Sequence, residues 1–149
     1  MYKKILVTFD GSAPSKNALK EAVELAKQSK GKIFLLYVIQ EVTLPHYAKG
    51  LISKTMKEYE KEIYFEAKSQ ANKLFEKNIK NYSNSGIKFE KKTLYGNTAE
   101  KILGFIKNNK IDIVVIGTTS RTGISKIITL GSVARKVSEE SKCPVLLIH

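Results

Sequence analysis

Two segments of the chain place glycine beside acidic or hydroxyl side chains directly after an apolar run. The first is "DGS" (10–12), which follows "KKILVTF". The second runs from Gly117 to Ser132, beginning with "GTTSRTG" and ending with "LGS" ahead of a helix-like segment. Glycine lets an oxygen approach the backbone closely, and a helix N-terminus offers free N–H groups to an anion. The second segment therefore fits a phosphate site and an ordinary turn with a serine cap equally well.

Two common phosphate-binding motifs are absent from the sequence. No G-x-x-x-x-G-K-[ST] occurs, and no G-x-G-x-x-G follows the first apolar run. The residues that remain as candidate anion contacts are Gly117, Gly131 and Ser132. The Ser132 hydroxyl could donate one further hydrogen bond to the anion.

Five runs rich in apolar, β-branched and aromatic residues predict strands. They cover residues 3–9, 32–39, 87–95, 111–117 and 144–149. The second and fourth are almost continuously apolar, which is typical of strands covered on both faces. The third alternates weakly and is expected near a sheet edge.

Between these strands, apolar residues recur at helical spacing and predict four helices. Ser12 is the expected N-cap of the first helix, Asn97 or Thr98 of the third, and Ser132 of the fourth. Each of these residues comes just before an apolar helical pattern. There its side-chain oxygen can accept a hydrogen bond from a free N–H group of the first turn.

The second helix is the longest and is predicted from about Lys54 to Tyr82, after a loop over 40–51. Its apolar residues form a stripe at helical spacing, with Lys and Glu between them. We interpret the whole stripe, from Met56 to Phe75, as surface that faces the core.

This alternation of strands and helices predicts an α/β fold, with residues 1–149 forming a single domain. The expected architecture is one doubly wound five-stranded parallel sheet, in the order 3-2-1-4-5, with helices on both faces. Ligands of such sheets bind at the carboxyl ends of the strands where the winding reverses, here between the first and fourth strands. "DGS" and "GTTSRTG" would then flank one crevice.

The formal charge of +12 raises the question of a nucleic-acid partner. Only Arg121 and Arg135 among the 26 basic residues are Arg, and the lysines are scattered and often adjacent to Glu. Specific base readout relies strongly on bidentate Arg. The charge therefore favours a solvated surface over a specific nucleic-acid interface.

The single cysteine, Cys143, rules out an internal disulfide and fits a reducing cytoplasm. No apolar run is long enough for a signal peptide or a membrane span. We expect a soluble, cytoplasmic protein without a membrane partner.

Side chains suited to catalysis are sparse. His46 and His149 are not tied to a nucleophile by any motif, and Cys143 precedes a proline at a strand entry, where it fits small-residue packing. No cluster has metal-ligand spacing. We therefore predict no catalytic residues and no metal ligands.

Several quoted segments, taken together and in order, resemble the universal stress protein (UspA) family. They are "ILVTFDGS", "LLYVI", "YGNTAEKIL", "IDIVVIGTTSRTG" and "LGSVARKV…CPVLLI". The resemblance extends over nearly the whole chain and is weakest between residues 42 and 86. It implies an α/β fold and a homodimer, and in one branch of the family ATP binding through G-x2-G-x9-G-[ST].

By this resemblance, Gly117, Gly131 and Ser132 would contact the phosphates and ribose of ATP. Asp10 would match the acidic residue near the adenosine, and the Val38 backbone would match the contact to the adenine edge. Ser120 and Val133 complete the expected cofactor-binding set.

The chain departs from that motif in two ways. Ser120 stands where the second glycine is expected, and ten residues instead of nine separate it from Gly131. One carboxylate without a general base predicts slow ATP hydrolysis at most, with Mg²⁺ accompanying the phosphates.

Three functions remain open. The first is an ATP-binding stress-response protein that acts as a small dimeric switch, with its homodimer formed through the edge strand "PVLLIH". The second is a nucleotide-free dimeric interaction protein of the same fold. A basic nucleic-acid binder comes third and is motivated by net charge alone.

Overall fold

The computed structural model describes residues 1–41, 54–118 and 131–149. The elements in chain order are β1 (Lys4–Thr8), α1 (Ala13–Ser29), β2 (Lys32–Gln40), α2 (Lys54–Ile79), the 3-10 helix η2 (Lys80–Tyr82), β3 (Phe89–Gly96), α3 (Thr98–Asn109), β4 (Ile113–Gly117), α4 (Ser132–Glu140) and β5 (Val145–Ile148).

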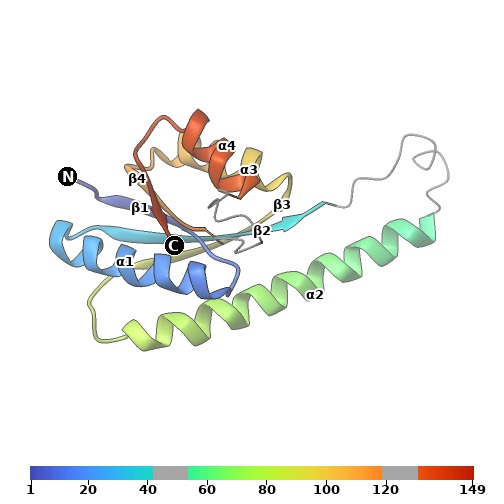
Figure 1. The fold of residues 1–149 in the computed structure, drawn as a ribbon. Coiled ribbons are helices and arrows are strands. Elements are labelled where there is room, and N and C mark those ends of the chain that lie inside the picture. Colours follow the sequence, from blue (N-terminus) through green and yellow to red (C-terminus); the bar gives the residue numbers. More distant parts are fainter. Residues whose placement is uncertain (42–53, 119–130) are drawn as a thin grey trace, which may run out of the picture.

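The five strands form one parallel sheet in the order β3-β2-β1-β4-β5, as the sequence predicted. In the central register, Ile5 of β1 pairs with Ile33 of β2 and with Ile113 of β4. Helices α1 and α2 cover one face of the sheet, and α3 and α4 cover the other (Figure 1). The winding therefore reverses between β1 and β4.

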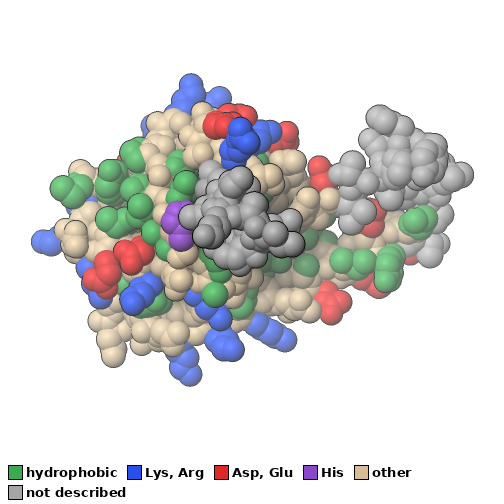
Figure 2. Space-filling view, in the orientation of Figure 1, with side chains coloured by type: hydrophobic (Ala, Val, Ile, Leu, Met, Phe, Trp, Pro, Cys, Tyr) green, Lys and Arg blue, Asp and Glu red, His purple; other side chains and the backbone are tan. Residues whose placement is uncertain are grey.

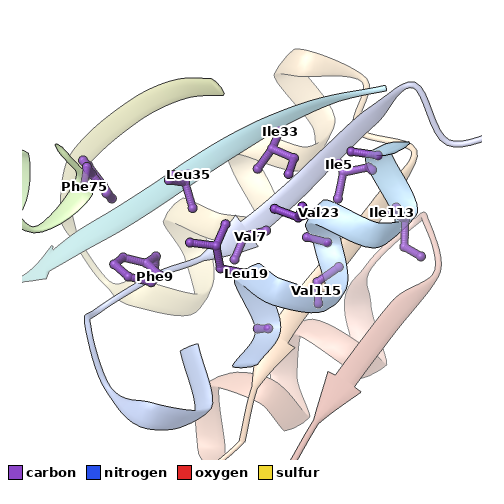
Figure 3. Close-up of a cluster of buried hydrophobic side chains, with 13 residues drawn as sticks. Ile5, Val7, Phe9, Leu19, Val23, Ile33, Leu35, Phe75, Ile113 and Val115 are labelled. Carbon is purple, nitrogen blue, oxygen red and sulfur yellow. The ribbon is translucent and has the colours of Figure 1, made fainter. Parts of the chain in front are cut away.

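Alternate residues of the strands supply two separate hydrophobic cores. Ile5 and Val7 of β1 are fully buried in the core beneath α1, together with Leu35 of β2 (Figure 3). Leu6, between them in the chain, is buried in the opposite core beneath α3 and α4. This follows from the two-residue period of a strand, which points successive side chains to opposite faces.

The helix N-caps agree with the sequence at two of three positions. Ser12 Oγ accepts from the Ser15 N–H at 3.4 Å, and Asn97 Oδ1 accepts from the Glu100 N–H at 3.1 Å. The prediction that Ser132 caps α4 is wrong by one residue. Gly131 is the N-cap, because its backbone is extended (φ −57°, ψ 147°) and its carbonyl accepts the Arg135 N–H at 2.9 Å.

The interpretation of the α2 stripe is correct for the C-terminal half of the helix and wrong for the N-terminal half. Ala71 and Phe75 are buried, whereas Met56, Tyr59 and Ile63 are 49%, 65% and 48% exposed. The reason is length. A helix of 26 residues spans about 39 Å, whereas the nine-residue β2 spans about 30 Å. The start of α2 extends beyond the sheet (Figure 1).

Phe75 fixes the covered half of α2 to the sheet, and its truncation should therefore weaken the fold. Its side chain is fully buried, and its ring centre lies 6.2 Å from that of Phe9. We predict that Phe75→Ala lowers the free energy of unfolding by about 3–5 kcal/mol in urea titrations. The matched change Phe65→Ala, on the same helix but 67% exposed, should cost no more than about 0.5 kcal/mol. Equal losses would contradict this account of α2.

Candidate functional site

A cavity of about 480 Å³ opens at the carboxyl edge of the sheet, at the point where the winding reverses. Its walls come from the ends of β1, β2 and β4 and from the first turns of α1, α3 and α4. The lining residues are Thr8, Phe9, Asp10, Ser12, Ser15, Leu36, Tyr37, Val38, Gln40, Thr98, Ile102, Ile116, Gly117, Thr118, Gly131, Ser132, Val133 and Ala134.

Six of the seven residues predicted to contact a cofactor line this one cavity. They are Asp10, Val38, Gly117, Gly131, Ser132 and Val133. The seventh, Ser120, lies outside the described residues. The sheet order explains the convergence, because parallel strands deliver their carboxyl ends, and the helix starts that follow, to the same edge. That these residues bind a ligand stays a prediction.

Three helices begin at the cavity, and their N-termini give it a positive electrostatic character. Ser12 at the start of α1, Thr98 at the start of α3 and Ser132 at the start of α4 all belong to its lining. Side chains cap α1 and α3, but the N-cap of α4, Gly131, makes no side-chain hydrogen bond. Within the described part of the chain, the N-cap of α4 thus supplies no side chain to the first-turn N–H groups, which suit an anion.

Gly117 and Gly131, the two glycines of the predicted motif, are glycine for different structural reasons. A Cβ on Gly117 would collide with the carbonyl of Pro14 and lie 2.6 Å from the Ser15 nitrogen, so α1 packs directly on the β4 backbone. A Cβ on Gly131 would meet no atom of the described residues within 4 Å. Packing therefore requires glycine at 117, whereas at 131 glycine keeps open the space beside the start of α4.

Asp10 brings a negative charge to the β1 side of the cavity. Its Oδ1 accepts the Ser12 backbone N–H at 2.9 Å. Partial burial acts to raise the pKa of Asp10, but hydrogen bonds from Ser12 and Ser15 outweigh it, and the pKa lies below its ordinary value. Asp10 is therefore ionised at neutral pH, and a carboxylate retains acceptor capacity for further hydroxyl donors.

Several lining residues were missed by the sequence reasoning, including Gln40, Thr98 and Thr118. The buried Thr118 hydroxyl lies 2.8 Å from His149 Nδ1. His149, for which the sequence gave no partner, is thus one hydrogen bond from the cavity lining. Thr118 directly follows Gly117, and that adjacency was the available signal. His46 lies outside the described residues.

Residues 1–41, 54–118 and 131–149 contain no group of three or more His, Cys, Asp or Glu side chains placed to hold a metal ion. None of the helices within them is both long and apolar enough to cross a bilayer.

Comparison with known proteins identifies the family. The model of the universal stress protein family matches residues 1–149. The chain belongs to the universal stress protein family. Universal stress protein MJ0531 of Methanocaldococcus jannaschii is 35% identical, with 99% of this chain and 82% of that protein covered. Universal stress protein YxiE of Bacillus subtilis is 32% identical over the full length of both.

Solved structures of universal stress proteins share the fold. The structure of MJ0577, also from M. jannaschii, superposes with a TM-score of 0.80 at 28% identity, covering 99% of this chain and 96% of that one. An Arabidopsis thaliana family member with AMP bound gives a TM-score of 0.66 at 18% identity, covering 98% and 90%. A universal stress protein in complex with cAMP gives 0.66 at 21%, covering 99% and 97%. The last two show likeness of fold alone.

The contrast between the two glycines can be measured through stability. Gly117→Ala should lower the free energy of unfolding by about 2–3 kcal/mol, because the added methyl group meets backbone that cannot rotate away. Gly131→Ala should cost about 1 kcal/mol or less, the ordinary loss at an N-cap. Denaturant titrations of both variants test this. A Gly117→Ala protein as stable as Gly131→Ala would contradict the packing reason.

Proposed function

We propose that this universal stress protein binds ATP in the cavity at the switch point. The observation that carries the proposal is the start of α4, which lines the cavity together with the starts of α1 and α3. Among the described residues, no N-cap side chain and no atom near a Gly131 Cβ position occupies it. Phosphate groups are the anions best matched to backbone N–H groups and a helix dipole. A cavity of about 480 Å³ also lies within the range of small-molecule sites.

In this proposal the cavity has a phosphate end and a nucleoside end. Gly131, Ser132 and Val133 hold the phosphates through the backbone and the Ser132 hydroxyl. Asp10 accepts hydrogen bonds from ribose hydroxyls, and the Val38 backbone meets the adenine edge. Gly117 lets α1 pack directly on the end of β4 and lines the cavity beside these groups, and Ser120 remains a predicted contact.

Mg²⁺ fits this arrangement only as a companion of the phosphates. Asp10 is the single carboxylate among the described residues that line the cavity. One carboxylate does not make a divalent-cation site by itself, so bound Mg²⁺ would be coordinated chiefly by phosphate oxygens and water. When bound, the ion would neutralise phosphate charge, while Asp10 would orient the ribose.

The ligands bound to other family members favour an adenine nucleotide over other anions as the ligand of this cavity. One family member has been solved with AMP and another with cAMP. We extend the preference to ATP because the Gly117–Ser132 segment resembles the ATP motif described above. Nucleotide occupancy would then serve as the signal of a stress-response switch, whereas a nucleotide-free interaction protein is the alternative.

The phosphate end can be tested with two nearly identical substitutions. Both Gly131→Asp and Gly131→Asn place a good N-cap in open space, so the fold should tolerate them equally. Calorimetry with ATP and Mg²⁺ should show that Gly131→Asp abolishes binding, because its carboxylate repels the phosphates. Gly131→Asn should retain measurable affinity.

Equal affinity of wild type and Gly131→Asp for ATP would contradict the phosphate site. Mass spectrometry of small molecules released from the purified, denatured wild type addresses the alternative function directly. Absence of nucleotide there, together with no calorimetric signal for ATP, would favour the nucleotide-free interaction protein.

We also propose that the protein forms a homodimer through β5. This strand lies at the sheet edge, pairs only with β4 among the described strands, and reads Val-Leu-Leu-Ile without a charge. The Pro144 carbonyl accepts from the N–H of Val114 in β4, and the Ile148 carbonyl accepts from the N–H of Thr118, directly after β4. By the two-residue period of a strand, Val145 and Leu147 direct their N–H groups to the open edge, where a two-fold mate could pair with them.

Leu147→Pro tests this dimer, because it should remove a donor from the open edge while sparing the pairing with β4. We predict that wild type sediments as a dimer at micromolar concentration and that Leu147→Pro shifts it toward monomer. Leu146→Pro is the matched control, since it removes a donor directed to β4 and should instead lower the free energy of unfolding. A monomeric wild type would rule this interface out.

A further inference from the structure

The exposed start of α2 carries an apolar stripe that the cavity does not explain. Tyr59 and Ile63 are 65% and 48% exposed, and Met56 lies on the same face at 49%. At about 100° per residue, Tyr59 and Met56 lie within about 40° of Ile63 around the helix axis. The spacing i, i+3, i+7 is that of a helix face that packs on another element.

Acidic side chains flank this stripe on both sides. At about 100° per residue, Glu60 and Glu66 lie about 60° to either side of Ile63, and Glu62 lies about 100° away. Lys57 and Lys61 lie about 120° and 160° away, and together with Glu60, Tyr64 and Tyr95 they line a hollow at the end of β3. The charged residues nearest to the stripe, Glu60 on one side and Glu66 on the other, are therefore both acidic.

The local charge contrasts with that of the whole chain. Residues 56–66 contain four Glu and two Lys, a net charge of −2 in a protein of formal charge +12. Figure 2 shows hydrophobic and acidic side chains next to one another along the projecting part of α2. An acidic border around an apolar face on a basic protein selects for a basic partner.

We propose that the exposed face of α2, formed by Tyr59, Ile63 and Met56 with Glu60 and Glu66 at its edges, docks an amphipathic helix of another protein whose apolar stripe is flanked by Lys or Arg. A second copy of the chain is a poor occupant. Whether two copies of this face pair in parallel or antiparallel, glutamates lie against glutamates. A basic helix instead buries the apolar stripe and pairs both edges.

The test uses the full-length protein and two fluorescent 18-residue helical peptides of opposite charge. One peptide has Leu at the helical spacing i, i+3, i+4, i+7 with Lys at the other positions, and its twin has Glu in place of Lys. Anisotropy at physiological ionic strength should show the Leu/Lys peptide binding at least tenfold more tightly. This outcome is discriminating, because the net charge of +12 by itself favours the Leu/Glu peptide.

Three variants locate the site. Tyr59→Gln with Ile63→Gln should weaken binding of the Leu/Lys peptide by about tenfold or more, since the apolar area of both side chains is lost. Phe65→Gln is the matched control: it removes an aromatic residue that is 67% exposed but lies about 160° from Ile63, and it should change affinity less than twofold. Glu60→Lys with Glu66→Lys should reverse the preference toward Leu/Glu.

Three results would overturn the proposal. The first is equal or tighter binding of the Leu/Glu peptide by wild type. The second is a loss with Phe65→Gln as large as that with the Tyr59 and Ile63 pair. The third is a dimer in sedimentation that Ile63→Gln dissociates, because a second copy would then cover the face. The charge-reversed pair keeps the test decisive if the Gln variants lose helical circular dichroism.

Discussion

The direct contact between the start of α1 and the end of β4 is the constraint on which the site depends. Gly117 has no side chain, and the Pro14 carbonyl and Ser15 nitrogen occupy the space where a Cβ would be. This close approach places the "DGS" turn beside the end of β4. The cavity therefore owes its position to backbone packing, and a side chain at 117 would separate the segments that form its walls.

The same sheet supports that contact from both sides. β1 lies between β2 and β4, and its successive residues Ile5, Leu6 and Val7 are buried in alternate cores. Two helix layers thus hold the central strand, and the carboxyl ends of its neighbours are fixed relative to each other. Because the sheet is held rigidly, it can position a site that is formed by loops and helix N-termini.

The cavity and the exposed face of α2 follow from different physical requirements. The cavity is lined by both polar and apolar side chains, is positively biased by helix N-termini, and lies where parallel strands end together. The exposed face arises because α2 is longer than the sheet it covers, so the covering half is held by Phe75 and the other half presents Tyr59 and Ile63 to solvent. One protein of this size can therefore carry a ligand site and a separate docking face without overlap.

The sequence by itself determined the strand and helix order, the cap at Ser12 and a cap at Asn97 or Thr98. These depend on local periodicity and on the short-range chemistry of turns, which neighbouring residues specify. The contacts predicted for Asp10, Val38 and Val133 came instead from the family resemblance, and the sheet order brings these residues into one cavity. Tertiary structure decided three further matters: that Gly117 is required for packing whereas Gly131 is not, that Thr118 links the cavity to His149, and that half of the α2 stripe is exposed. Each depends on distances between segments far apart in the chain. A helical period gives the direction in which a side chain points, but only the extent of the sheet beneath it decides whether that side chain is covered.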